Sequence, residues 1–154
     1  MNKRLETELF KSIVEHTPLI SIDLIIRNED GKALLGQRLN RPAQNYWFVP
    51  GGRILKDESF ENAFKRVTFE ELGVQISINE AKFLGIYEHF YSDNFSGTCF
   101  STHYVVHGYE ISLMPHQIKE GANKRGNSSR LTQSFHFFMF EPIFSPVNAL
   151  NQPI

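Results

Sequence analysis

The stretch that decides the fold reads Gly52-Arg53-Ile54-Leu55-Lys56-Asp57-Glu58, followed by Arg66 and then by Glu70-Glu71-Leu72-Gly73-Val74. Gly51 stands directly before it, so that two adjacent glycines follow a short apolar segment and Pro50. Glycines in such a place allow backbone carbonyls and amides to approach a phosphate or a metal ion closely. The start of this stretch therefore predicts an anion- or metal-binding loop.

A helix over about residues 58–72 follows this loop. One of its faces is formed by the residues Phe60, Ala63, Phe64, Val67 and Glu71. Ser59 is the expected N-cap, and Gly73 is the expected C-terminal stop. Near the helix end, Glu70 and Glu71 place at least one carboxylate where it can return to the loop, and one or two carboxylates with a carbonyl and substrate phosphate oxygens typically bind Mg²⁺. The alternative is an ordinary turn followed by a solvated helix face.

The rest of the chain predicts strands around this helix. We expect an amphipathic helix at 5–15 and strands at 19–26, 32–37, 47–49, 82–91 and 99–111, with residues 50–52 ending the third strand. The first two strands form a hairpin through the turn at residues 28–31. This arrangement indicates an α/β sandwich around a mixed β-sheet. A second covering helix is expected from the C-terminal region, where residues 134–140 fit a strand as well as a helix.

Composition limits the class of protein. The 154 residues and 17.8 kDa correspond to one domain, residues 1–154, and 16 Lys+Arg against 17 Asp+Glu give no field for binding nucleic acid. Cys99 is the single cysteine and cannot form an intramolecular disulfide, so a reducing, cytoplasmic location is expected. No apolar run approaches the length of a signal peptide or a membrane span.

The chain changes character after His107. Residues 1–107 hold 14 of the 17 acids and 12 of the 16 bases, while four of the seven prolines lie beyond them. We therefore separate residues 112–154 as a divergent tail. One interpretation is a translated shift of reading frame, which translation of the other frames of the encoding DNA would test.

The glycine stretch resembles the Nudix box, whose pattern is Gly, five residues, Glu, seven residues, Arg-Glu, apolar, any, Glu-Glu, any, Gly, apolar. The positions in register are Gly52, Glu58, Arg66, Glu70, Glu71, Gly73 and Val74. The Glu that the pattern places after Arg66 is Val67 here, and the next apolar position is Thr68. In many Nudix enzymes the missing Glu is a metal ligand or the general base for attack on phosphorus.

Surrounding segments resemble the GDP-mannose mannosyl hydrolases, which themselves lack that Glu. The similar segments are Thr17-Pro18-Leu19, Leu35-Gly36-Gln37-Arg38, Asn40 to Gln44, Tyr46 to Arg53, His89 to Gly97 and Thr102 to Val106. The resemblance covers about residues 3–107. It implies a Nudix-type α/β/α sandwich and a Mg²⁺-dependent reaction in which water attacks the anomeric carbon of GDP-mannose or GDP-glucose with inversion, releasing GDP and free sugar.

The resemblance also implies roles for individual residues. The metal ligands would be the Gly51 carbonyl and Glu71, with Glu70 beside them. Arg38 and Arg53 would bind diphosphate oxygens, because a guanidinium presents paired donors and keeps its charge. Leaving-group donors would be His89 and Tyr104, and Asp23 would support an arginine or the oxocarbenium-like sugar. The N-terminal helix, with Arg4, Leu5 and Phe10, would help hold the nucleotide across a homodimer interface.

The family's metal-binding Gln and adjacent catalytic His are expected in a loop that this chain replaces. Counting from Tyr104 places Lys124 and Arg125 there, and neither can act as base or ligand at neutral pH. The nearest substitute is Pro115-His116-Gln117, which makes His116 the candidate base and Gln117 the candidate ligand.

Several nearby residues have structural interpretations. Arg66 and Glu58 are expected to brace the loop and helix rather than touch substrate, and Asp93 and Asn94 to form a turn. Arg38 and Arg41 are equally well read as surface charges, Phe10 as a core residue, and His103 and His107 as structural.

Two other functions remain open at this point. One is a Nudix pyrophosphatase that cleaves a nucleotide sugar at phosphorus, giving GMP and sugar 1-phosphate. The other is a catalytically impaired domain that binds a nucleotide sugar without turning it over, as the replaced loop would favour.

Overall fold

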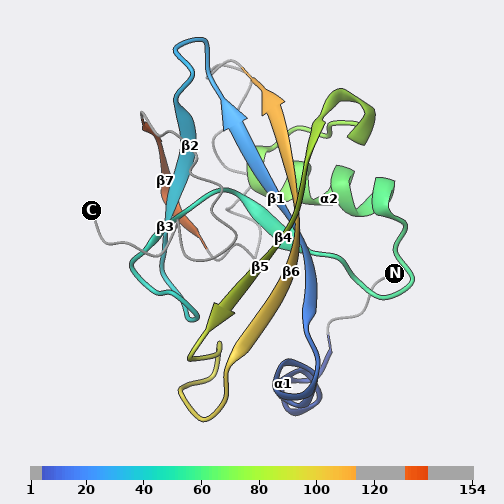
Figure 1. The fold of residues 1–154 in the computed structure, drawn as a ribbon, viewed down its shortest axis with the longest axis vertical. Helices are drawn as coiled ribbons and strands as arrows, with labels where there is room; N and C mark the ends of the chain where they lie inside the picture. The colour runs from blue at the N-terminus through green and yellow to red at the C-terminus, as the bar shows by residue number, and fades with distance from the viewer. Residues whose placement is uncertain (1–4, 114–130, 139–154) are drawn as a thin grey trace.

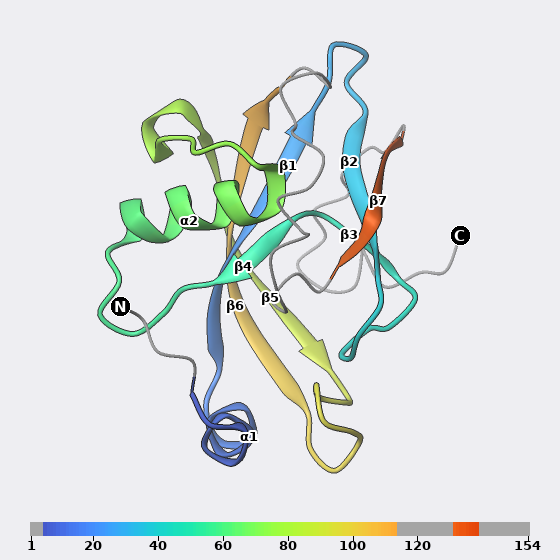
Figure 2. The same ribbon diagram turned by 180° about the vertical axis from the view of Figure 1, so that it is seen from behind.

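The computed structural model describes residues 5–113 and 131–138 (Figures 1 and 2). Its elements in chain order are α1 (Thr7–His16), β1 (Leu19–Arg27), β2 (Ala33–Arg38), β3 (Trp47–Phe48), β4 (Gly51–Arg53), α2 (Phe60–Leu72), the short 3₁₀ helix η1 (Ile78–Glu80), β5 (Lys82–Tyr91), β6 (Thr102–Ser112) and β7 (Leu131–Phe138). Figure 2 shows α2 lying across one face of the sheet, while α1 lies at one end of it.

The strands form one mixed, seven-stranded sheet with the path β3-β2-β1-β6-β5. β1 runs parallel to β6 from Leu19↔Tyr104 to Arg27↔Ser112, whereas β5 is antiparallel to β6. On its other side, β1 pairs with two strands. Its end pairs with β2 at Arg27↔Ala33, and its earlier residues Ser21 to Asp23 pair with β4. The expected α/β class with a mixed sheet is confirmed.

The predicted stop of the third strand at residues 50–52 is confirmed, since β3 ends at Phe48, but strand β4 at Gly51–Arg53 was not predicted. The chain turns at Pro50, whose carbonyl accepts a hydrogen bond from the Leu24 amide at 2.8 Å, and Gly51–Arg53 then pairs antiparallel with β1 as β4. A three-residue strand with two glycines carries too little side-chain pattern to be recognised in the sequence.

Two other segments differ from expectation or decide between alternatives. β6 begins at Thr102 rather than at residue 99, because the Asn94 side chain donates to the Phe100 carbonyl and keeps that segment in the preceding loop. Of the two readings of residues 134–140, the strand is confirmed over most of the segment by β7, which pairs antiparallel with β2. The second covering helix was expected in a region that, apart from β7, lies outside the described residues.

Helix α2 has both expected caps. Ser59 Oγ accepts a hydrogen bond from the Asn62 amide at 3.3 Å, and Gly73 takes a left-handed conformation, with φ of 73°, while its amide donates to the Phe69 carbonyl. Glycine suits this position because it adopts positive φ without a steric penalty. The helix starts at Phe60 rather than 58 because the Glu58 side chain bonds back to the Leu55 amide in the loop.

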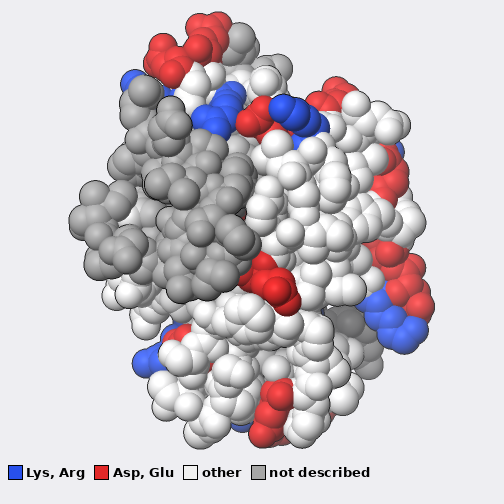
Figure 3. Space-filling view, viewed as in Figure 1, with Lys and Arg blue, Asp and Glu red and all other residues white. Residues whose placement is uncertain are grey.

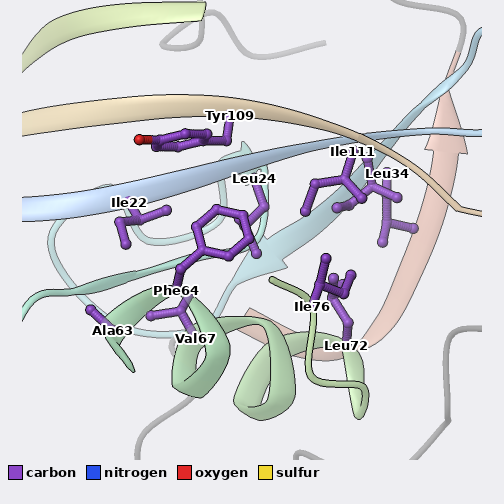
Figure 4. Close-up of a cluster of buried hydrophobic side chains, with 11 residues drawn as sticks. Ile22, Leu24, Leu34, Ala63, Phe64, Val67, Leu72, Ile76, Tyr109 and Ile111 are labelled. Carbon is purple, nitrogen blue, oxygen red and sulfur yellow. The ribbon is translucent and has the colours of Figure 1, made fainter. Parts of the chain in front are cut away.

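The alternation of β1 and β6 supplies two cores on opposite faces of the sheet. The core beneath α2, drawn in Figure 4, contains Ile22, Leu24, Ile26, Leu34, Ala63, Phe64, Val67, Leu72, Ile76, Tyr109 and Ile111. The other core, next to α1, contains Val14, Leu19, Phe48, Tyr91, Tyr104 and Val106. In β1 the alternate residues Ile22, Leu24 and Ile26 therefore enter the core beneath α2, while Leu19 enters the core next to α1.

Within the described part of the chain, no helix combines the length and the apolar character that crossing a membrane requires.

Two phenylalanines of α2 provide a matched test of this packing. Phe64 is fully buried, whereas Phe69 is 52% exposed on the same helix. We expect Phe64→Ala to lower the free energy of unfolding by about 3–5 kcal/mol, since it loses buried area and leaves a cavity. Phe69→Ala is expected to change it by less than about 0.5 kcal/mol. Urea unfolding measures both, and equal losses would contradict the core assignment.

Candidate active site

Arg66 ties the loop after β4 to helix α2. Its Nε donates to Glu58 Oε1 at 2.7 Å, its Nη2 to Glu58 Oε2 and to the Arg53 carbonyl, and its Nη1 to Glu70 Oε2 at 2.9 Å. Hydrogen bonding to Arg66 lowers the pKa of Glu58, and the same interaction raises the pKa of Arg66. The expected bracing role of Arg66 and Glu58 is confirmed.

The two glycines of the loop are required by close packing. A Cβ on Gly51 would lie 2.6 Å from the Ile22 carbonyl oxygen and 2.7 Å from Asp23 Oδ1. A Cβ on Gly52 would lie 3.0 Å from a methyl group of Val67, which is itself fully buried. β4 thus passes so near to β1 and α2 that only glycine fits at Gly51, and Val67 fills the space beneath Gly52.

The two adjacent carboxylates on α2 have different surroundings. Glu70 is held by Arg66 and its side chain is 41% exposed. Glu71 is buried on the helix face that packs toward β4 and β1. Glu71 is therefore the carboxylate of α2 that is turned inward, and Glu70 belongs to the bracing network.

Asp23, His89 and Arg38 lie together. Asp23 in β1 faces His89 in β5, with 3.7 Å between Asp23 Oδ2 and His89 Nε2. Burial raises the pKa of Asp23 to about 7, although the positive charge of Arg38 acts in the opposite direction. Burial and, to a smaller extent, the charge of Arg38 lower the pKa of His89. Near pH 7 the group therefore combines a neutral imidazole, a carboxyl close to its midpoint and a permanent cation.

Aromatic rings surround this cluster, and two of them were not singled out as site residues from the sequence. The guanidinium carbon of Arg38 lies 5.2 Å from the centre of the Phe48 ring. Tyr91 stacks parallel to His89 at 6.2 Å and packs edge-on against Tyr104 at 6.3 Å. The sequence held a signal for Tyr91: it follows His89 by two residues in a strand, so the two side chains lie on the same face of the sheet.

Arg53 lies against a phenylalanine of the N-terminal helix. Its guanidinium carbon lies 4.2 Å from the centre of the Phe10 ring, and Phe10 packs on Phe95 at 4.8 Å. A cation over an aromatic face is stabilised electrostatically. Phe10 thus belongs to the margin of the α1 core and also holds a site arginine, while Leu5 lies exposed just before α1.

Some candidates lie elsewhere. Arg4, His116 and Gln117 lie outside the described residues. His103 and His107 lie on the opposite face of β6 from Tyr104, where His103 stacks on Phe90 at 4.3 Å and His107 meets Phe60 edge-on at 4.9 Å. Within residues 5–113 and 131–138, no three His, Cys, Asp or Glu side chains are grouped to hold a metal by themselves.

Comparison with known proteins identifies this arrangement. The family model described as the NUDIX domain matches residues 17–142. The chain is a member of the Nudix family. It is 43% identical over 110 residues to the low-salt glycan biosynthesis protein Agl8 of Haloferax volcanii, a match that covers 71% of this chain and 69% of that protein.

Solved Nudix structures share the fold. A MutT/nudix family protein from Enterococcus faecalis matches with a TM-score of 0.54 at 22% identity, over 87% of this chain but only 51% of that one. A MutT NUDIX hydrolase from Burkholderia pseudomallei matches with a TM-score of 0.51 at 26% identity, over 64% of this chain and 69% of that one. With the family shown, the sequence pattern places its Nudix box at the loop from Gly52 to Glu58 and helix α2, with Val67 in the place of one Glu.

The hydrogen bonds between Arg66 and Glu58 predict a pH-dependent contribution to the free energy of unfolding. At pH 7 we expect Glu58→Gln to lower the free energy of unfolding by about 2 kcal/mol, because the Glu58 side chain is only 6% exposed and accepts charged hydrogen bonds from Arg66. The folded-state pKa of Glu58 lies below its ordinary value of 4.5, so this contribution is complete above that value and is lost as pH falls through the folded-state pKa.

Urea unfolding between pH 3 and 7 measures the effect. The difference between wild type and Glu58→Gln should shrink toward acid pH, whereas Glu8→Gln, whose side chain is 81% exposed, should show almost no difference at any pH. A Glu58→Gln difference that stays constant over this range would contradict the assignment.

Proposed function

We propose that this Nudix hydrolase cleaves GDP-mannose or GDP-glucose at the anomeric carbon and releases GDP and free sugar. The observation that carries the proposal is Val67, fully buried against Gly52 where many Nudix enzymes place a carboxylate for attack on phosphorus. The resemblance of residues 3–107 to the GDP-mannose mannosyl hydrolases, which lack the same carboxylate, supports it. The name of the Haloferax relative, a glycan biosynthesis protein, fits a sugar-containing substrate.

Departure of GDP requires that its diphosphate charge be neutralised as the glycosidic bond breaks. Arg38 and Arg53 are the arginines proposed for this task, because a guanidinium donates paired hydrogen bonds to phosphate oxygens and never loses its charge. Their side chains are held over Phe48 and Phe10, respectively. Cations fixed before the reaction stabilise developing negative charge without reorganising.

The polar cluster beside Arg38 would act on the leaving group and the sugar. His89 and Tyr104 are neighbours across β5 and β6 and are proposed to donate hydrogen bonds to the departing diphosphate. Asp23, beside Arg38 and His89, is proposed to orient Arg38 or to face the oxocarbenium-like sugar when it is ionised. These roles use hydrogen-bond donors and a carboxylate that the fold already brings together.

A divalent cation fits the remaining donors. Nudix hydrolases generally use Mg²⁺ or Mn²⁺, and we propose Mg²⁺ held by the Gly51 carbonyl and the buried Glu71. A carbonyl, one carboxylate and substrate phosphate oxygens make a typical Mg²⁺ donor set, and the cation would supply further charge neutralisation. Glu70, committed to Arg66, would act on this site by fixing the end of α2.

The general base is expected outside the described residues. His116 as base and Gln117 as a metal ligand remain predictions, and an unchanged rate and pH–rate profile in His116→Ala would refute the first.

Product identification tests the proposed reaction. The protein is incubated with GDP-mannose or GDP-glucose and Mg²⁺ in ¹⁸O-labelled water, and the products are resolved by mass spectrometry and NMR. We expect unlabelled GDP and a free sugar that carries the ¹⁸O label on its anomeric carbon and is released first as the inverted anomer. No turnover is expected after metal removal with EDTA. GMP and sugar 1-phosphate, with label on phosphate, would instead establish the pyrophosphatase; tight GDP binding without turnover would establish an impaired binding domain.

We also propose that the protein is a homodimer that associates through its N-terminal helix. Leu5 and Leu9 are 45% and 53% exposed there, and a net charge of −1 gives little repulsion between copies. A second apolar surface lies on edge strand β5, where Ile86 and Phe90 are each 61% exposed and Figure 3 shows few charged side chains.

Sedimentation velocity separates these two surfaces. We expect a wild-type dimer that becomes monomeric in Leu9→Glu, because a charge then replaces an apolar contact, and that persists in the matched variant Phe90→Glu. A monomeric wild type, or dissociation only in Phe90→Glu, would contradict the helix interface.

A further inference from the structure

The turn at residues 93–97 is organised by the side chain of Asn94, which is fully buried. Its Nδ2 donates to the Phe100 carbonyl at 2.8 Å, and its Oδ1 accepts from the Ser96 amide at 2.9 Å and from the Ser96 hydroxyl at 2.6 Å. The backbones of Asn94 and Gly97 also bond to each other in both directions. Because one side chain satisfies groups from both sides of the loop, the turn has a single, well-defined shape.

The turn is also fixed to the start of β6. The Thr102 hydroxyl donates to the Asp93 carbonyl at 2.8 Å, and Thr102 is buried. On the other side of the turn, β5 ends at Tyr91, which stacks on His89. The turn is therefore a rigid extension of the two strands that carry His89 and Tyr104.

One arm of the turn reaches the loop after Arg38. Asp93 Oδ2 accepts from Arg41 Nη1 at 3.1 Å, an ion pair between residues 52 positions apart. The loop that carries Arg41 closes back on Arg38, whose amide donates to the Tyr46 carbonyl and whose carbonyl accepts from the Asn45 amide. Since a partly exposed ion pair adds little to stability, its main effect is on where this loop sits.

The other arm reaches Arg53. Phe95, one residue after Asn94, packs on Phe10 of α1, and the Arg53 guanidinium lies over the same Phe10 ring. Phe95 thus limits the positions open to Phe10, and Phe10 limits those open to Arg53.

We propose that the Asn94 turn is a positioning unit that sets both diphosphate-binding arginines, acting on Arg38 through Asp93 and Arg41 and on Arg53 through Phe95 and Phe10. Arginine side chains lose much rotamer freedom when they bind an anion, so holding them in advance lowers the cost of binding and of reaching the transition state. Asp93, Asn94 and Phe95 need not touch the substrate. The catalytic consequence rests on the proposed function, whereas the positional one does not.

The positional consequence is measured by NMR in the substrate-free protein. The side-chain protons of Arg53 lie over the Phe10 ring, so their resonances should be shifted upfield by its ring current. We expect Phe95→Ala and Asn94→Ala to remove most of that shift and Asp93→Ala to leave it. Asn28→Ala is the matched control, since Asn28 Oδ1 accepts from the Lys32 amide and so organises a different turn, the hairpin between β1 and β2.

The catalytic consequence is measured by turnover of GDP-mannose. We expect Asp93→Ala, Arg41→Ala and Phe95→Ala each to lower kcat/KM about 10-fold, and Asn94→Ala more, while Asn28→Ala lowers stability without lowering kcat/KM. The exchanged pair Arg41→Asp with Asp93→Arg should recover most of what either substitution alone loses, which a general loss of stability would not produce.

The results separate the two hypotheses. Arg53 resonances that are the same in wild type, Phe95→Ala and Asn94→Ala would overturn the positioning unit whether or not the protein turns over GDP-sugars. An absence of turnover in wild type with the expected NMR changes would refute the proposed reaction and leave the positioning unit supported. Should Asn94→Ala fail to fold, Asp93→Ala and Phe95→Ala, which keep the Asn94 bonds, decide the question.

Discussion

The guanidinium of Arg66 is the interaction on which the site depends most. It bonds at once to Glu58 at the end of the glycine loop, to the Arg53 carbonyl at its beginning and to Glu70 on its own helix. A loop of this length has many conformations available, and bonding both of its ends to the Arg66 guanidinium removes most of them. The position of β4, and with it that of Gly51 and Arg53, follows from that closure.

The parallel pairing of β1 with β6 provides the second constraint. Because β1 alternates, its even-numbered residues Ile22 and Leu24 enter the core beneath α2, while Asp23 points toward His89. A shift of one residue would exchange these sets and bury the carboxylate under the helix. The apolar packing that stabilises the sheet therefore also fixes the polar cluster.

Much of this could be predicted from the sequence, for reasons that are local. The caps of α2, the bracing by Arg66 and the hairpin of β1 and β2 all depend on residues close together in the chain, and each was confirmed. β4 was missed because two glycines have no side-chain pattern, and its pairing with β1 depends on contacts distant in sequence. The roles of Arg41 and Asp93 were hidden for the same reason: each resembles an ordinary surface or turn residue until the fold brings the two loops together.

The packing of Val67 against Gly52 also limits which substitutions the protein can accept during evolution. A glutamate there would be longer than valine by two heavy atoms and charged, in a place where the adjacent strand has already come as close as a glycine allows. A single Val67→Glu replacement would place a charge in a fully buried contact, so the chain could regain the carboxylate at little cost in stability only where a cation or another donor meets its head group.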